Sequence, residues 1–116
     1  MYGSALHLAI VRTNLSLTDM MIKRGAEVNI ADSDGNTPLH FIMNVFSKNE
    51  SKYKAIAECL VMSGAKPNAK NNELWAPLHI AARKGQIDGI KWAKMANEIL
   101  SEMHMEVFDF NLPGGT

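Results

Sequence analysis

One short phrase built around Leu-His occurs three times in this chain of 116 residues. Its copies occupy residues 4–9 (SALHLA), 37–42 (TPLHFI) and 76–81 (APLHIA). The histidines of the first two copies are 33 residues apart, and those of the last two are 39 apart. A phrase that recurs at such a period is typical of repeat proteins, in which each unit buries its apolar face only against its neighbours.

Two further markers recur in phase with this phrase. A Gly-Ala pair that starts at Gly25 returns at Gly64, 39 residues later, and Asn29 returns as Asn68 after the same interval. The next asparagine in this series, Asn111, follows after 43 residues. Relative to a basic period of about 33, the second unit therefore contains about six additional residues and the third about ten.

Thr-Pro-Leu-His phrases at this period resemble ankyrin repeats, and the in-phase markers extend the resemblance over nearly the whole chain. The resemblance implies an all-α fold: an ankyrin-repeat α-solenoid of stacked helix-turn-helix units with β-hairpin fingers. We expect repeat 1, without its first finger, at residues 1–31, repeat 2 at 32–70 and repeat 3 at 71–111. Residues 112–116 would begin a fourth repeat. Because neither end has an evident polar cap, we interpret the chain as a fragment of a longer array whose uncapped ends favour self-association.

Each phrase should begin a helix. In the second copy Thr37 can cap the helix, and Pro38 occupies its first position, where the missing N–H costs nothing. Ser4 would cap the helix of the first copy in the same way. The third copy has Ala76, whose side chain accepts no hydrogen bond, so we expect that helix to lose about 1 kcal/mol of capping.

The second helix of each repeat and the two insertions follow from the same alignment. Apolar spacing predicts a helix at about 17–24, which Gly25 ends in a left-handed conformation, and Gly64 ends the corresponding helix of repeat 2. The additional residues of repeat 2 fall near 46–53, where a polar centre predicts a long loop between helices. In repeat 3 the apolar spacing predicts one extended helix, Asp88–His104. That helix either forms a contact surface of its own or covers neighbouring apolar surface.

The two complete fingers differ at the residue that should turn the chain. The first contains Gly35, which can take a positive φ. Leu74 occupies the corresponding place in the second finger, and leucine adopts a positive φ poorly. We therefore expect the second turn to change shape, with Asn71 or Asn72 in the left-handed conformation.

The resemblance also assigns a structural role to the asparagine at the base of each finger. Asn29 and Asn68 are expected to bond the backbone of the neighbouring finger. In some relatives this asparagine is hydroxylated by an oxygenase, which makes Asn29 a candidate modification site.

Composition excludes several classes of partner. Lys and Arg together number 12, as do Asp and Glu, so no net field draws the chain to nucleic acid. No run of about 18 apolar residues occurs, and we expect no direct membrane insertion. The single cysteine, Cys59, fits a reducing compartment, cytoplasmic or nuclear. The eight methionines are interpreted as adaptable core filler rather than as a binding surface.

Structural roles explain the side chains that could carry chemistry, so we predict no catalytic residue, cofactor or metal. The resemblance implies that His7, His40 and His79 bond the cap hydroxyl and the finger backbone. Stacked repeats also hold these histidines about 8–10 Å apart, too far to share a zinc ion. Cys59 lies in an apolar stretch without a neighbouring basic residue, unlike a reactive thiol.

The resemblance implies a protein–protein interaction module, which binds another protein or another domain of its own chain through a concave surface of fingers and first helices. One alternative is the regulatory or substrate-recruiting arm of a larger multidomain enzyme, such as a kinase or acyltransferase. A purely structural spacer is another, and an autonomous enzyme is not expected. In this family variable positions carry specificity. Here they are Ile30, Asp32, Ser33, Asn36, Asn44, Val45, Lys70, Asn72, Trp75, Arg83 and Lys84.

Trp75 is the candidate anchor of that surface, because tryptophan is enriched among the residues that dominate binding energy. It either points from the fingertip toward a partner or folds back over the helix of its own repeat, and the sequence leaves both arrangements open. Trp92 lies in the predicted extended helix. We expect it to pack against a neighbouring helix or to cover the open end of the array.

Overall fold

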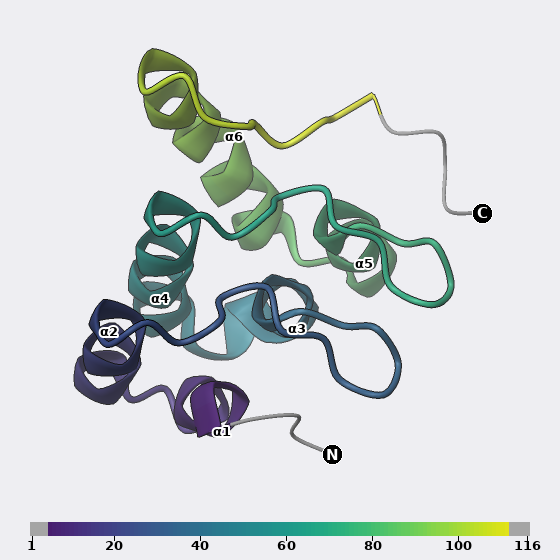
Figure 1. Ribbon diagram of the computed structural model, residues 1–116. Helices are drawn as coiled ribbons and strands as arrows, with labels where there is room; N and C mark the ends of the chain where they lie inside the picture. The colour runs from purple at the N-terminus through teal and green to yellow at the C-terminus, as the bar shows by residue number, and fades with distance from the viewer. Residues whose placement is uncertain (1–4, 112–116) are drawn as a thin grey trace.

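The structure, a computed structural model, describes residues 5–111. Its helices pair along the chain: α1 (Ala5–Val11) with α2 (Leu15–Lys23), α3 (Pro38–Val45) with α4 (Glu50–Met62), and α5 (Pro77–Lys84) with α6 (Ile87–Glu102). The pairs stack in sequence order, and the loops that join them project to one side (Figure 1). The fold is the all-α solenoid that the repeats predict. Ser4, the expected cap of repeat 1, and the expected start of a fourth repeat at 112–116 lie outside the described residues.

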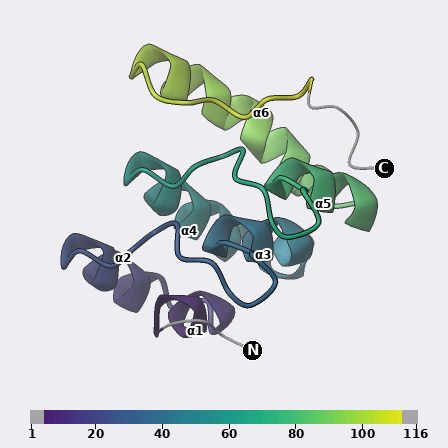
Figure 2. The same cartoon turned by 45° about the vertical axis from the view of Figure 1, so that its right-hand side comes forward.

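The stack has two layers, which share one apolar core. The first helices α1, α3 and α5 form one layer, and the second helices α2, α4 and α6 form the other (Figure 2). Leu39 and Ile42 of α3 and Ile56 and Leu60 of α4 are at most 1% exposed. Burying each such side chain stabilises the fold by about 1.5–3 kcal/mol. No helix within residues 5–111 is both long and apolar enough to cross a bilayer.

The insertion in repeat 2 is helical, so the prediction of a long loop at residues 46–53 is wrong. A short 3-10 turn, η1 (Phe46–Asn49), follows α3 directly, and α4 begins at the next residue. Phe46 is fully buried, and its ring centre lies 6.1 Å from that of Trp92 in α6. Tyr53 is also buried and meets Phe41 edge-on at 6.2 Å. Two rings at the borders of the polar stretch thus hold it against the core.

A side chain from repeat 3 fixes the same insertion. Gln86, which precedes α6, accepts a hydrogen bond from the backbone N–H of Ser47 at 2.9 Å. Its amide nitrogen donates to the carbonyl of Asn44, also at 2.9 Å. These bonds satisfy backbone groups where α3 passes into η1, which helical bonding alone leaves without partners.

The fingers are closed loops rather than the β-hairpins we expected. In the first finger one main-chain bond crosses the loop, from Asp32 N to Asn36 O at 2.9 Å, and in the second Asn71 N bonds Trp75 O at 3.0 Å. No residue between 5 and 111 is in a regular strand. Because each loop turns back within five residues, it has no room for the second rung of a ladder.

The prediction for the second finger is also wrong. Leu74 itself takes the left-handed conformation, with φ 67°, close to the 80° of Gly35. Asn71 and Asn72 do not. The Asn71 side-chain oxygen accepts hydrogen bonds from the backbone nitrogens of residues 73 and 75, at 2.9 and 3.0 Å. Because these bonds hold the backbone of the turn in one conformation, Leu74 adopts the positive φ that this conformation requires.

α6 is extended as predicted, although it ends at Glu102, two residues before the expected end. His104 follows with φ 58°, in the place that Gly25 and Gly64 occupy after the corresponding helices. Beyond the turn, Asn97 holds the backbone of Phe108, accepting from its N–H at 2.7 Å and donating to its carbonyl at 2.9 Å.

The rings of repeat 3 close the core. Trp92 is 4% exposed and lies against the buried ring of Phe108, edge-on at 5.5 Å. It therefore joins α6 both to the insertion of repeat 2 and to the segment that follows α6, in agreement with the expectation that it packs against a neighbour.

Candidate interaction surface

The histidine of the second phrase joins two repeats. The Nδ1 atom of His40 accepts a hydrogen bond from the backbone N–H of Thr37 at 3.0 Å and lies 2.9 Å from its hydroxyl oxygen. The Nε2 atom lies 2.8 Å from the carbonyl oxygen of Trp75 in the next finger. Because Nδ1 accepts from an N–H, Nε2 carries the proton and donates to that carbonyl. Burial lowers the pKa of His40, although the Trp75 carbonyl and Asp32 act in the opposite direction.

The third phrase begins its helix in the same way. His79 Nδ1 accepts a hydrogen bond from Ala76 N at 3.0 Å, the counterpart of the bond that His40 makes. His7 is buried at the start of the stack. Burial lowers the pKa of His7, while the backbone of Asn36 and the charge of Asp32 raise it. The histidines thus form a line through the first helices, each placed by its own repeat.

The asparagines at the finger bases bond across repeats. Asn29 donates to the carbonyl of Gly64 at 3.1 Å and accepts from the N–H of Lys66 at 2.7 Å. Asn68 makes the corresponding pair, with the carbonyl of Val107 at 2.8 Å and the N–H of Asp109 at 2.9 Å. The positive φ values of Gly25 (92°) and Gly64 (98°) turn the chain from each second helix into these bonds.

The tips of the two fingers are also joined. The backbone N–H of Asn72 donates to the carbonyl of Asp34 at 3.0 Å, and its side chain donates to the carbonyl of Ser33 at 3.0 Å. Asn71 donates to the side-chain oxygen of Asn36 at 2.9 Å. The fingers therefore present one continuous edge with a fixed register between repeats.

None of the residues predicted to contact a partner is buried. The exposed ones are Ser33, Asn44, Lys70, Asn72, Arg83 and Lys84. The half-buried ones are Ile30, Asp32, Asn36, Val45 and Trp75. Three of these side chains have structural bonds of their own: Asp32 holds the first turn by accepting from the backbone of residues 34 and 36, and those of Asn36 and Asn72 join the fingers.

Trp75 lies over the first helix of its own repeat, one of the two arrangements the sequence left open. The guanidinium carbon of Arg83, in the last turn of α5, is 4.2 Å from the centre of a Trp75 ring. Such a contact restricts the long arginine side chain. Neither an ion pair nor a hydrogen bond occupies that guanidinium within residues 5–111.

Sequence reasoning missed Leu74 as a surface residue. It is 70% exposed at the second fingertip, next to Trp75. An exposed leucine in a left-handed conformation costs about 1–2 kcal/mol relative to glycine there. The signal was available in the sequence, because the position normally held by glycine carries a large apolar side chain.

Cys59 faces a carboxylate rather than a cationic side chain. Its sulfur donates to a carboxylate oxygen of Asp19 at 3.3 Å, and Asp19 also pairs with Lys23 at 3.0 Å. Burial raises the pKa of the Cys59 thiol, and Asp19 raises it further. The thiolate that a nucleophile requires is therefore disfavoured.

Comparison with known proteins identifies these repeats. A family model for ankyrin repeats in many copies matches residues 6–41, and one for the single ankyrin repeat matches residues 34–72. Human Rabankyrin-5 is 36% identical over 88 residues, which are 71% of this chain and 8% of that protein. An ankyrin repeat protein of Rickettsia felis is 35% identical over 74 residues, 62% of this chain and 31% of its own length. One from fowlpox virus is 29% identical over 113 residues, 96% of this chain and 17% of its own.

The chain thus spans less than a third of the length of each of these relatives. The matched segments include residues 6–9 of the first phrase, the whole second phrase, the first finger and the Asn29 contact described above. The chain belongs to the ankyrin repeat family.

Proposed function

We propose that this chain binds a partner protein through the concave surface formed by its fingers and first helices. The observation that carries the proposal is the Trp75–Arg83 stack at 4.2 Å, beside the exposed Leu74. Tryptophan and arginine are the residues most enriched among those that dominate binding energy. The joined fingers add pre-organisation, because a surface that is already ordered loses little entropy on binding.

The chemistry of this site favours a carboxylate next to an apolar side chain on the partner. The stacked guanidinium of Arg83 is held ready for the bidentate hydrogen bonds that carboxylates accept. Lys84, the next residue in the chain, is exposed and adds positive charge beside it. Leu74 offers an apolar contact at the tip.

Parallel affinity capture tests the proposal. The native chain and Trp75→Ala are used as baits in the same lysate, with Met20→Ala on the outer face of α2 as the control. We expect Trp75→Ala to weaken binding of a specific, saturable partner by about 2 kcal/mol, and Met20→Ala to leave it unchanged. Equal binding by all three baits would exclude Trp75 as an anchor, and a bait that retains no saturable partner would favour a structural spacer.

The second candidate is a regulatory or substrate-recruiting arm of a larger enzyme such as a kinase or acyltransferase. Its support is the small share of each relative that this chain spans, 8% to 31%. The flanking sequence decides between the two, since it would carry catalytic motifs. The protonated Cys59 supports the inference that the repeats themselves are not catalytic, and a single cysteine supports a reducing compartment, cytoplasmic or nuclear.

A further inference from the structure

The chain contains two Asp-Gly pairs, and the structure places them in contrasting settings. Asp34 and Gly35 lie at the tip of the first finger, whereas Asp88 and Gly89 lie in the first turn of α6. An aspartate followed by glycine is prone to isomerise, because glycine has no side chain to shield its backbone nitrogen from the preceding carboxyl group. The two pairs share this reactive sequence, so the fold decides how far each one reacts.

The carboxyl group of Asp34 is available for reaction. Its side chain is exposed, and no other group within residues 5–111 bonds or pairs with it. Asp32, two residues earlier, differs in this respect, because its carboxylate accepts hydrogen bonds from the backbone N–H of Asp34 and of Asn36, both at 2.9 Å. The carboxylate of Asp34 can therefore approach the next backbone nitrogen, whereas that of Asp32 is held within the turn.

Three hydrogen bonds hold the backbone around Asp34, and two of them come from the second finger. The N–H of Gly35 donates to the carbonyl of Asp32 at 3.0 Å. Asn72 donates its backbone N–H to the carbonyl of Asp34 and its side-chain N–H to that of Ser33, each at 3.0 Å. The side-chain oxygen of Asn72 also lies only 2.5 Å from the place that an added Cβ would take at Gly35. One residue of the second finger thus restrains the tip of the first.

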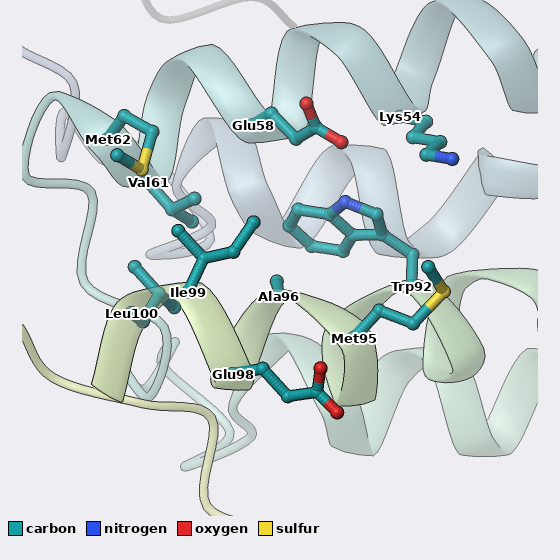
Figure 3. A pocket seen from close by; sticks show the side chains of 10 residues that line it. All are labelled: Lys54, Glu58, Val61, Met62, Trp92, Met95, Ala96, Glu98, Ile99 and Leu100. Carbon is teal, nitrogen blue, oxygen red and sulfur yellow. The ribbon is translucent and has the colours of Figure 1, made fainter. Parts of the chain in front are cut away.

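The second Asp-Gly pair is held by the core. Gly89 is buried, and a Cβ added there would lie 3.2–3.3 Å from the side chains of Phe46 and Met43. Trp92, three residues later, is buried between α6 and α4 (Figure 3). A helical backbone has a ψ of about −42°, and closing a ring from Asp88 onto Gly89 requires ψ to leave this range. Reaction at Asp88 therefore requires the start of α6 to separate from repeat 2, which costs much of the free energy of unfolding.

We propose that Asp34 is a site of spontaneous isoaspartate formation, and that its contact with the second finger sets the rate. When the fingers separate, the nitrogen of Gly35 loses its proton and bonds to the side-chain carboxyl carbon of Asp34. One carboxyl oxygen leaves as water, which gives a five-membered succinimide ring. Water then opens the ring. Cleavage of the new bond restores aspartate, whereas cleavage of the original peptide bond leaves the main chain running through the side chain of Asp34. One water leaves and one returns, so the mass is unchanged and nothing is oxidised or reduced.

Isomerisation changes the joint between the two fingers. The carbonyl of Asp34 that accepts the N–H of Asn72 leaves the main chain and becomes a free carboxylate. The main chain of the turn also becomes one carbon longer, so the bond from Asp32 N to Asn36 O no longer closes the same loop. The register between the fingers is therefore lost at the edge of the candidate interaction surface. The reaction itself needs no partner, so it is independent of the proposed function.

Ageing of the 116-residue chain tests this proposal. The protein is kept at neutral pH and body temperature, and samples are digested so that each isoaspartyl peptide separates from its aspartyl form. Electron-transfer fragmentation assigns the modified residue, and a protein isoaspartyl methyltransferase, which methylates the free carboxylate, measures the total. We expect isoaspartate to accumulate about tenfold or more faster at Asp34 than at Asp88. Equal accumulation at both sites would mean that the reaction follows global unfolding, and the proposal would be wrong.

Two synthetic peptides separate the effect of the fold from that of the local sequence. One contains residues 29–40 and the other residues 83–94, so each carries one Asp-Gly pair without the rest of the protein. We expect similar rates in the two peptides, and a faster reaction at Asp34 in its peptide than in the folded chain, because the peptide lacks the second finger. If the peptide rates differ as much as those in the folded chain, the local sequence rather than the fold sets the difference, and the proposal is overturned.

A matched pair of asparagine variants tests the role of the second finger. Asn72→Ala removes the side-chain bond to Ser33 and the contact with Gly35, and it should speed isomerisation at Asp34 about fivefold. Asn44→Ala is the control and should leave the rate unchanged, because Asn44 is exposed at the end of α3 and its side chain bonds no group within residues 5–111. An unchanged rate in Asn72→Ala would overturn the role of the second finger. An equal acceleration at Asp88 would do the same, since the variant would then act through global unfolding.

Discussion

The first finger turns at residues 32–36 and the second at 71–75, and their sequences, DSDGN and NNELW, share no residue at any matched position. Their geometry is nevertheless the same. Asp32 in one and Asn71 in the other accept hydrogen bonds from the backbone two and four residues later, all at 2.9–3.0 Å. Gly35 and Leu74 take φ values of 80° and 67°. The side-chain oxygen at the first position therefore determines the conformation of the turn, and glycine at the fourth position only lowers the free-energy cost of the positive φ.

The helix starts that follow the two fingers differ in the same way. Thr37 and Ala76 have nearly equal backbone angles, φ −84° and ψ 169° against φ −82° and ψ 164°. Only Thr37 offers a hydroxyl, at a long 3.4 Å from His40 N. In both repeats the histidine ring accepts from the cap N–H at 3.0 Å. The histidine ring therefore makes the stronger hydrogen bond at the start of each helix, and the threonine hydroxyl adds a weaker one in repeat 2.

Removing the ring of His40 should have the largest effect on this arrangement. His40→Ala leaves the Thr37 N–H and the Trp75 carbonyl without partners inside the protein, and it opens a cavity at a site that is 1% exposed. We expect the free energy of unfolding to fall by about 3 kcal/mol.

Urea unfolding followed by circular dichroism measures this change. His79→Ala is the matched control, since His79 is only half-buried at the last pair of helices, and its cost should be clearly smaller. Equal losses in both variants would show that burial does not set the importance of His40.

Replacing Gly35 in the first finger should destabilise the protein, whereas replacing Leu74 in the second finger should change its stability little. An alanine Cβ at Gly35 would lie 2.5 Å from the side-chain oxygen of Asn72 and 2.7 Å from its backbone nitrogen, in a conformation with positive φ. We expect Gly35→Ala to destabilise the protein by about 2 kcal/mol in urea unfolding. Leu74→Ala exchanges one side chain for another at the same φ, so its cost should stay within about 0.5 kcal/mol. A large loss from Leu74→Ala would mean that the exposed leucine packs against the fold after all.

Supplying the hydroxyl that Ala76 lacks should stabilise repeat 3. Ala76→Thr gives α5 the hydroxyl that Thr37 gives α3, and we expect a gain of about 1 kcal/mol in the free energy of unfolding. Thr37→Ala provides the reciprocal measurement, with a loss of similar size. If Ala76→Thr destabilises the protein, the fully buried Ala76 site is too tight for the larger side chain.

Mild acid should produce the smallest effect. Burial lowers the pKa of both His7 and His40 below the ordinary value of 6.5, so the folded state disfavours their protonated forms. A group with a lowered folded pKa contributes stability above its unfolded pKa and loses it as the pH falls toward the folded value. The urea midpoint should therefore decline modestly between pH of about 7.5 and 6.5, and further below that. In His40→Ala the decline should be shallower, and an equal slope would assign the effect to His7 alone.

Much of this protein could be predicted from its sequence because the repeats are local. The phrase around His40, the glycines that end the second helices and the asparagines at the finger bases act within one repeat or on the next one. Their spacing predicted the stacked helix pairs and the extended helix α6. None of the residues predicted to contact a partner is buried, and their role in binding stays a prediction.

The error at residues 46–53 lies where contacts between repeats decide local structure. The polar stretch at 46–53 reads as a loop, yet Phe46 stacks on Trp92 and Gln86 bonds the adjoining backbone, so the chain stays helical. No property of those residues alone reveals partners 40 residues away. The interpretation of the methionines as core filler holds for Met21, Met43 and Met105, which lie in or against the core. Met95 and Met103 are exposed, because which face of α6 remains uncovered depends on how α4 packs against it.

Outside the insertion, the residues alone predict which segments form the paired helices and that the pairs stack, because caps, turn residues and apolar spacing act over a few residues. The helical conformation of the insertion and the burial of Trp92 follow only from the tertiary structure. Both depend on ring contacts or hydrogen bonds between repeats, and those partners exist only once the helix pairs have stacked.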